Sequence, residues 1–168
     1  MDSDALMDRI EAARTEADQG GKTAPEPSVK FLVVRVDRTR YALPADQVRE
    51  IVVGATRHYL PFAPPYIRGL INRHGEPYAV FDLRVRFEKE ALEAETFVIS
   101  GSEGGRLAFL VSDIVEILKV PERRVHAISS DGEASACFAG ALTIRDEEVL
   151  IIHIGNILAD LARDLEAF

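Results

Sequence analysis

The strongest structural signals in the chain lie in one stretch, Leu60-Pro61-Phe62-Ala63-Pro64-Pro65-Tyr66-Ile67-Arg68-Gly69-Leu70-Ile71-Asn72-Arg73-His74-Gly75, followed by Tyr78-Ala79-Val80-Phe81-Asp82-Leu83-Arg84. Its three closely spaced prolines exclude a strand there, because proline cannot donate to a β-ladder. Gly69 and Gly75 flank a strand where a side chain would obstruct a close approach or a positive φ. The stretch therefore predicts a rigid loop, then a hairpin of residues 67–73 and 78–82, and then a short turn or helical piece.

Short apolar segments separated by turn residues continue on both sides of this hairpin. We expect further strands at residues 29–36, 41–43, 48–53, 57–60, 97–99, 107–111, 114–120, 138–145 and 149–154. Two more hairpins follow, one from residues 97–99 and 107–111 and one from the last two strands. No long helices alternate with these strands, so the pattern predicts an all-β sandwich or small barrels rather than a parallel α/β sheet.

Three other segments lie between or after these strands. Residues 88–95 are expected to form a charged surface loop, and residues 122–137 a mostly polar loop. A closing helix is predicted over residues 156–166, with one apolar face made by Ile157, Leu158, Leu161 and Leu165.

The first 28 residues differ from the rest in composition and in the spacing of apolar residues. Residues 3–18 predict a helix capped by Ser3 or Asp4, with a thin apolar stripe of Leu6, Ile10, Ala13 and Ala17. Residues 19–28 form a linker by composition. The domain organisation is thus a helix and linker at 1–28 and a β domain at 29–168. The helix is either a loosely attached extension or a docking helix that covers an apolar barrel face or contacts a partner.

The charge of the chain argues against two classes of partner. The formal net charge is −8; residues 1–28 hold seven acids and three bases, and the remainder 21 acids and 17 bases. The acidic excess is therefore spread along the chain, and there is no basic stripe. Phosphate neutralisation supplies most nucleic-acid affinity, so nucleic acid is a poor candidate, and an anionic membrane surface is disfavoured for the same reason.

Nothing in the sequence indicates export or membrane insertion. The N-terminus lacks the basic region and long apolar run of a signal peptide. No apolar run approaches the roughly 20 residues that span a bilayer. Cys137 is the only cysteine, so no internal disulfide is possible. We expect a soluble, cytoplasmic protein.

Motifs for catalysis or cofactor binding are missing from the sequence. There is neither a GxxxxGK phosphate loop nor a GxGxxG fingerprint. None of the four histidines lies three or four residues from another histidine or from Cys137, so no compact zinc spacing exists. His153 is expected to be a core or edge residue, and Cys137 a small buried hydrophobe. We therefore predict no catalytic residues, no metal and no cofactor, and favour a binding role.

The opening stretch resembles the signature of the CheW family, in which a Pro-x-Ala-Pro loop leads into Ile-Arg-Gly-x-x-Asn-x-Arg-Gly and a strand ending Asp-Leu-Arg. The matching residues are Pro61, Pro64, Ile67, Arg68, Gly69, Asn72, Gly75, Asp82, Leu83 and Arg84. Three further blocks agree in order and spacing: residues 41–44 with 48–51, residues 110–111 with 114–118, and the final hairpin with its helix. The resemblance covers about residues 29–165.

The resemblance implies a non-enzymatic adaptor that couples chemoreceptors to a CheA-type histidine kinase at membrane-associated receptor arrays. It implies two SH3-like five-stranded β-barrels packed side by side. In the family, the second barrel docks on the kinase regulatory domain, and the groove between the barrels receives the helical tip of a chemoreceptor; other CheW-like domains are further possible array partners. By position, the groove would include Val48, Glu50, Ile51, Gly69, His74, Ala108, Ile114 and Ile117. The four aliphatic residues Val48, Ile51, Ile114 and Ile117 have an alternative role as barrel core.

One position departs from the family pattern. The family has arginine where this chain has His74, paired with the glutamate found here as Glu50. Arg73 is not expected to substitute, because adjacent strand residues face opposite sides. Arg68 shares the face of His74 but is six residues away, roughly 20 Å along an extended strand. A Glu50–His74 pair would be weaker at neutral pH, because the ordinary His pKa is about 6.5. The hypothesis is a divergent receptor set, or a kinase controlling something other than swimming.

Two other functions stay open. An enzyme or ligand-binding barrel would need a pocket with converging polar groups, and the sequence shows no such set. A CheW-like adaptor in a non-flagellar pathway, such as pilus motility, biofilm formation or other kinase control, would have the same fold and docking surfaces.

Overall fold

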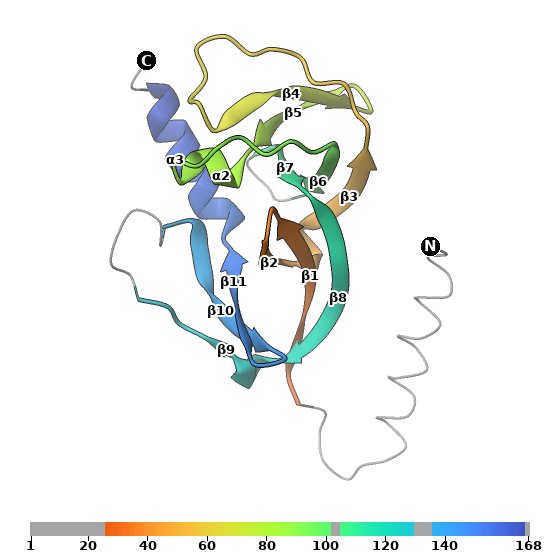
Figure 1. Ribbon diagram of the computed structural model, residues 1–168, viewed down its shortest axis with the longest axis vertical. Helices are drawn as coiled ribbons and strands as arrows, with labels where there is room; N and C mark the ends of the chain where they lie inside the picture. Colours follow the sequence, from red (N-terminus) through yellow and green to blue (C-terminus); the bar gives the residue numbers. More distant parts are fainter. Residues whose placement is uncertain (1–25, 102–104, 130–135, 167–168) are drawn as a thin grey trace.

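The computed structural model describes residues 26–101, 105–129 and 136–166, which form two curved β-sheets stacked along the long axis of the molecule (Figure 1). The expectation of an all-β fold with few helices is confirmed. The predicted helix at residues 3–18 and nearly all of its linker lie outside the described residues, so the two interpretations of that segment both stand.

The first sheet has six strands and is built from two separate parts of the sequence. In spatial order they are β8 (Asp113–Pro121), β1 (Ser28–Val36), β2 (Thr39–Pro44), β11 (Glu147–Ile152), β10 (Phe138–Ile144) and β9 (Val125–His126). Five strands were expected. The sixth, β9, pairs with β10 at only two positions and lies in a segment predicted as polar loop. Two residues are too short to show a strand period, so the sequence carries no signal for it.

The second sheet has five strands, all from the sequence between β2 and β8. In spatial order they are β3 (Val48–Val53), β6 (Thr96–Ser100), β7 (Leu107–Val111), β5 (Glu76–Phe81) and β4 (Ile67–Arg73). The three predicted hairpins are present as the antiparallel pairs β4–β5, β6–β7 and β10–β11. Residues 57–60, expected as a strand, contribute only an isolated bridge between His58 and Leu70.

Strand β1 holds the first sheet against the second because both of its faces are buried. Phe31 and Val33 belong to an apolar cluster confined to the first sheet. Leu32, Val34 and Val36 belong to a larger cluster that also contains buried residues of the second sheet, such as Ile99. Burial on both faces explains why the segment is a continuous apolar run rather than an alternating one.

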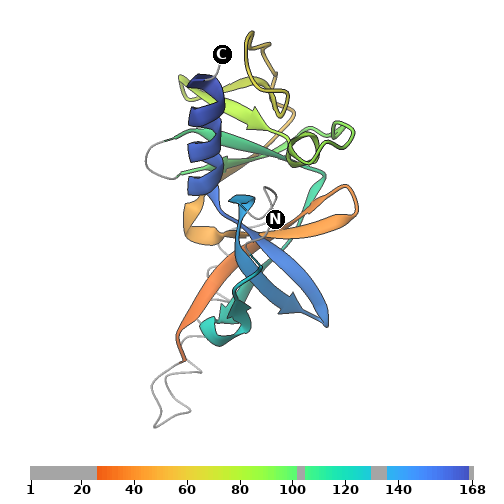
Figure 2. The ribbon, with the colours of Figure 1, turned by 90° about the vertical axis from the view of Figure 1, so that its left-hand side faces the viewer.

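The described residues also include two α-helices and two short three-residue 3-10 helices. They are η1 (Ala45–Gln47), α2 (Leu83–Arg86), η2 (Glu122–Arg124) and α3 (Ile154–Glu166). Helix α3 follows the last strand of the first sheet but packs against the second sheet (Figure 2). Its Ile154 and Ile157 are buried in the shared core, and Asp164 accepts a hydrogen bond from the Tyr66 hydroxyl. No helix among the described residues is long and apolar enough to cross a bilayer.

The burial of individual side chains tests three local expectations. Cys137 is buried, as predicted, and burial raises the pKa of its thiol. His153 is exposed rather than in the core; its Nδ1 accepts a hydrogen bond from the Asn156 amide at 3.0 Å and so caps α3. The loop at residues 88–95 is not all surface, because Leu92 is buried.

Candidate functional site

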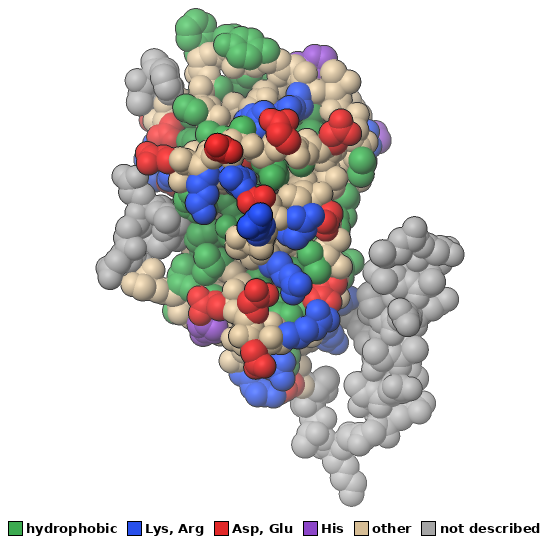
Figure 3. Space-filling view, viewed as in Figure 1, with side chains coloured by type: hydrophobic (Ala, Val, Ile, Leu, Met, Phe, Trp, Pro, Cys, Tyr) green, Lys and Arg blue, Asp and Glu red, His purple; other side chains and the backbone are tan. Residues whose placement is uncertain are grey.

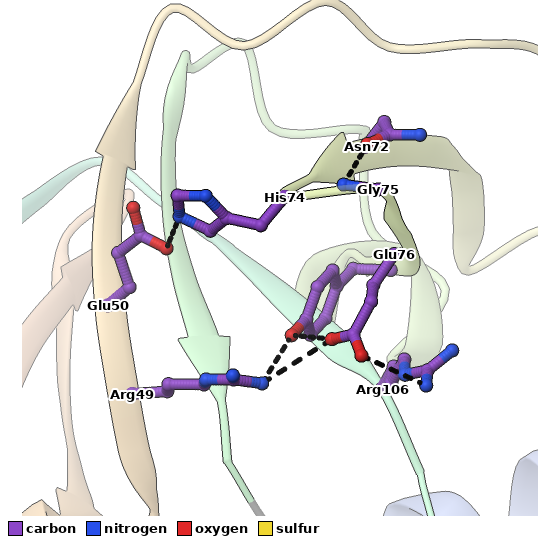
Figure 4. Close-up of polar contacts among 8 residues, drawn as sticks. Arg49, Glu50, Asn72, His74, Gly75, Glu76 and Arg106 are labelled. Carbon is purple, nitrogen blue, oxygen red and sulfur yellow. Dashed lines mark hydrogen bonds and ion pairs between the residues drawn. The ribbon is translucent and has the colours of Figure 1, made fainter.

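The β4–β5 hairpin ends in a tight two-residue turn. Arg73 pairs with Glu76, which leaves His74 and Gly75 as the turn, with φ of 53° and 80°. Two positive φ values in a two-residue loop define a type I′ turn, whose twist suits a hairpin. The Gly75 amide donates to Asn72 Oδ1 at 3.1 Å, which fixes the turn (Figure 4).

Two side chains of this hairpin, Arg73 and His74, reach Glu50 on β3. Arg73 forms a hydrogen-bonded ion pair with Glu50 Oε1, and His74 Nε2 lies 3.7 Å from Glu50 Oε2. The expectation that Arg73 faces away from Glu50 is wrong. The alternation rule assumed an extended backbone through residue 74, but His74 has left-handed φ and belongs to the turn. Arg73 therefore supplies a guanidinium one position earlier than the family's arginine.

The Glu50–Arg73 pair joins the two outer strands of the second sheet. β3 and β4 stand at opposite ends of its strand order, so contact between their side chains means that the sheet curls back on itself. The Arg73 hydrogen bond lowers the pKa of Glu50, and the nearby charges of Arg73 and His74 lower it further. Glu50 is thus ionised at neutral pH and fixed at the rim of the sheet.

A second polar group lies beside Glu50 and His74 (Figure 4). Glu76 accepts from Arg49 at 3.5 Å and from Arg106 at 3.3 Å, and Arg49 also donates to the Tyr78 hydroxyl at 3.1 Å. These residues line an open hollow of about 620 Å³. Because Glu76 sits between the two arginines and takes a hydrogen bond from each, the group links β3, β5 and the start of β7. Sequence reasoning missed this group, because Arg49 and Arg106 lie far from Glu76 in the chain.

Asp82 is the first residue of the Asp-Leu-Arg motif and is fully buried. Its Oδ1 accepts from the Arg84 amide at 3.0 Å and caps α2. Its Oδ2 accepts from Arg68 at 3.0 Å and from the Leu92 amide at 2.9 Å. Arg68 is therefore committed to Asp82 and the loop, and the motif residues Arg68, Asp82 and Arg84 are structural.

Residue 69 must be glycine because the loop before β4 crosses the strand at close range, and no partner protein is needed to explain it. Its φ is +121°, and a Cβ there would lie 2.5 Å from the His58 carbonyl oxygen. His58 and Leu70 exchange backbone hydrogen bonds of 2.7 and 2.8 Å at this crossing. The proline-rich loop is thereby fastened across β4.

The structure separates the predicted groove residues into two groups. Ile51 and Ile117 are 43% and 48% exposed, so neither is core, and Val48 and Ile114 are half-buried against the shared apolar cluster. Ala108 is fully buried on the central strand β7, so its side chain is not on the surface of this structure, and its place in the groove stays a prediction. Gly69 is also buried. Strands β3 and β8, which carry the exposed pair, run along the same side of the molecule (Figure 1).

Sequence reasoning missed the most exposed apolar side chains. Tyr59 is 88% exposed, Phe62 86% and Val53 72%. Tyr59 and Phe62 lie in the loop between β3 and β4, at the end of the molecule beyond the second sheet (Figure 1). Tyr59 was expected in a strand at residues 57–60 and Phe62 in the proline-rich loop; aromatic residues next to prolines were the available signal.

The described residues offer no cluster of metal ligands, and one face of the molecule mixes charges of both signs. Within residues 26–101, 105–129 and 136–166, no three His, Cys, Asp or Glu side chains are placed to hold a metal ion. On the face drawn in Figure 3, acidic and basic side chains are interspersed with apolar ones. The surface is thus of the mixed kind that suits protein contacts.

Comparison with known proteins agrees with the sequence resemblance. The profile of the CheW-like domain matches residues 30–162. The chain belongs to the CheW-like domain family. This CheW-like domain is 25% identical to the chemotaxis protein CheW of Rhizobium meliloti (strain 1021), over 80% of this chain and 90% of that protein. Its fold matches the crystal structure of the scaffolding protein TtCheW from Thermoanaerobacter tengcongensis with a TM-score of 0.70 and 22% identity, covering 76% of this chain and 90% of that one.

Proposed function

We propose that this CheW-like domain is a non-enzymatic adaptor that couples chemoreceptors to a CheA-type histidine kinase. Family membership supports the role, and the observation that carries the site is the exposed pair Ile51 and Ile117 on outer strands of the two sheets. Adaptors work by presenting fixed docking surfaces, and a shared core that joins both sheets keeps such surfaces in a constant geometry. The proposed setting is cytoplasmic, at membrane-associated receptor arrays.

The receptor site is proposed to bind a helical hairpin tip between the two sheets. Recognition of a helix by a groove needs apolar anchors with polar groups at the rim. Ile51 and Ile117 provide exposed aliphatic anchors, with Val48 and Ile114 behind them. Glu50, held ionised by Arg73, and the exposed His74 provide the polar rim. Gly69 and Ala108 support this surface from inside.

The kinase regulatory domain is proposed to dock on the second barrel, the unit built on the five-stranded sheet. The loop after β3 exposes Tyr59 and Phe62 there. Aromatic side chains are common anchors of protein interfaces because they bury a large area with few rotatable bonds. A Phe62→Ala variant should therefore weaken kinase binding more than receptor binding.

Co-purification with the cognate kinase regulatory domain and a receptor-tip fragment tests the assignment. Ile51→Glu and Ile117→Glu should each reduce receptor binding at least tenfold, roughly the cost of placing a charge in an apolar contact, and leave kinase binding unchanged. Leu165→Glu is the matched control, since Leu165 is 46% exposed but lies on α3. Equal losses from all three variants, or a loss of kinase binding alone, would refute the receptor site.

His74 is proposed to tune which receptors bind. In a His74→Arg variant, Glu50 would face two guanidinium groups. The ratio of the adaptor's affinity for its own receptors to its affinity for receptors of other systems should therefore change. Unchanged binding to its own receptors would argue against specialisation at this position. Chemotaxis and a non-flagellar output remain equally compatible with these surfaces, and identification of the co-purifying receptors separates them.

A further inference from the structure

Four polar side chains converge on the open hollow at the rim of the second sheet. Arg49 comes from β3, Tyr78 from β5 and Ser100 from the end of β6, and Arg106 directly precedes β7. Figure 4 shows Arg49 and Arg106 reaching Glu76 from opposite sides. The folded sheet thus brings together polar groups from distant parts of the sequence.

A β-bulge in β3 turns Arg49 toward this hollow. Val48 pairs with Ser100 and Glu50 with Ile99, so Arg49 is an extra residue without a partner of its own in the ladder. Regular alternation would place Arg49 and Glu50 on opposite faces of the strand. With the bulge, both side chains reach the β4–β5 hairpin, as Figure 4 shows. The hollow therefore lies directly beside the proposed receptor site.

The charges at this rim favour an anionic ligand. The charged side chains that meet here are Arg49, Arg73, Arg106, Glu50 and Glu76. Three guanidinium groups and two carboxylates give a net charge of +1, with histidine counted as neutral. The whole chain carries −8, so this positive excess is local. One further carboxylate would balance it.

Both arginines of the hollow have donors to spare. A guanidinium group carries five N–H groups. Among the described residues, Arg49 donates only from Nη1, to Glu76 and Tyr78, and Arg106 only from Nη2, to Glu76. The two arginine side chains are 59% and 52% exposed, so their other N–H groups are open to a ligand. Such groups bind a carboxylate through short, charge-assisted hydrogen bonds.

Ser100 is a further donor that the fold leaves unused. It is 3% exposed, and its hydroxyl has no hydrogen-bond partner within residues 26–101, 105–129 and 136–166. A buried polar group without a partner destabilises a fold, so each such group calls for an explanation. Because Ser100 lines the hollow, a ligand oxygen bound there would give the hydroxyl the acceptor that the chain does not supply.

We propose that this hollow is a carboxylate site, which binds an aspartate or glutamate side chain of the receptor tip through Arg49 and Arg106, with Ser100 as an additional donor. Arg49 adjoins Glu50 and is two residues, about 7 Å, from Ile51, so a helix on the receptor site lies beside the hollow. The choice of partner rests on the proposed function; the carboxylate site does not. The two arginines select receptors that are acidic at this point against those that are neutral or basic.

Titration of the free chain with sodium propionate tests the site without a partner. Propionate carries the carboxylate of a glutamate side chain, and sodium chloride at equal ionic strength controls for screening. In heteronuclear NMR spectra, propionate should cause saturable shifts of the Arg49 and Arg106 Nε–H signals and of the Ser100 amide. Equal shifts with chloride, or shifts that do not saturate, would overturn the site.

Ser100→Ala separates ligand binding from fold stability. The variant should weaken propionate binding roughly threefold to tenfold, the value of one hydrogen bond. It should not lower the melting temperature, because the hydroxyl has no partner in the free chain. Unchanged propionate binding would remove Ser100 from the site.

Charge exchange with a receptor-tip fragment tests the partner. Arg49→Glu and Arg106→Glu should each lower receptor affinity at least tenfold, because they set like charges against each other. Arg124→Glu makes the same charge change at an exposed position in η2, outside this hollow, and should have no such effect. Acidic residues of the receptor tip are then changed to lysine one at a time. One of these changes should restore binding to the Arg49→Glu variant.

The outcomes separate the site from its partner. Equal losses from all three arginine variants would reduce the effect to overall charge and refute the receptor contact. A loss that no receptor lysine restores would refute it as well. A chain that binds no receptor tip at all would refute the proposed function, and the propionate titration alone then decides the carboxylate site.

Discussion

At the scale of single residues, the charge and contacts at the rim of the second sheet depend on the side chains that reach Glu50. The resemblance implies an arginine at residue 74, whereas this chain has histidine there and arginine one residue earlier. The type I′ turn lets both reach Glu50, so the substitution keeps a guanidinium partner and adds an imidazole. A rule based on strand alternation failed because it was applied across a turn.

The lowered pKa of Glu50 predicts a pH-dependent contribution to stability. A carboxyl whose pKa is lower in the folded state stabilises the fold above its unfolded pKa, and this is lost as pH falls through the folded pKa. We expect Glu50→Gln to lower the melting temperature at pH 7. The difference from wild type should begin to shrink as pH falls to the usual value of 4.5 and should vanish below the lowered pKa of the folded state. Glu93→Gln, at an exposed loop position, is the control; a difference that persists in acid would contradict the assignment.

Gly69 and Gly75 both have positive φ, yet they should respond differently to substitution. A Cβ at Gly69 would lie 2.5 Å from the His58 carbonyl oxygen, whereas nothing lies within 4 Å of one at Gly75. Gly69→Ala should cost more than about 2 kcal/mol, because strain adds to the clash. Gly75→Asn should cost under about 1 kcal/mol, since asparagine tolerates left-handed φ. Urea unfolding measures both, and similar losses would count against the close approach.

At the scale of elements, Asp82 joins β5, α2 and the loop at residues 88–95. Asp82→Ala removes the helix cap and leaves the Arg68 guanidinium and the Leu92 amide without their buried acceptor. Losing one partner of a buried ion pair costs about 3–5 kcal/mol. Urea unfolding should show a loss of that size. Asp46→Ala, at an exposed position in η1, should stay within about 0.5 kcal/mol; a matching loss there would refute the role of Asp82.

The elements also show how far sequence reasoning extends. The three hairpins and the closing helix were predicted because glycine, proline and apolar periodicity are local signals. The strand β9 and the buried Leu92 were missed, because a two-residue pairing and a loop hydrogen bond to Asp82 depend on distant residues. The residues of the candidate site also divide into those that the sequence indicated and those that only the structure shows. Family position indicated Glu50, Ile51 and Ile117, but not that Ala108 is buried or that Arg73 replaces the family's arginine.

At the scale of the whole molecule, the two sheets share one apolar core. Helix α3 reinforces this, since it continues the first sheet and packs on the second. We therefore expect a single unfolding transition, with far-UV circular dichroism and tyrosine fluorescence giving the same midpoint. Two separate midpoints would show that the sheets are independent units.

Shortening a buried side chain of α3 tests the same coupling between the two sheets. Ile157 is 2% exposed, so Ile157→Ala should cost about 2–5 kcal/mol while unfolding stays cooperative. Leu165→Ala, on the exposed side of the same helix, should change stability by less than about 0.5 kcal/mol. Loss of only one part of the transition in Ile157→Ala would contradict a shared core.

An adaptor must hold two partners at once, and sedimentation of a three-component mixture measures this directly. The chain is combined with its cognate kinase regulatory domain and a receptor-tip fragment, first in pairs and then together. Distinct docking surfaces on the two sheets predict both binary complexes and a ternary complex that contains all three proteins. Mutual displacement of the kinase domain and the receptor tip, or binding of neither, would contradict the adaptor role.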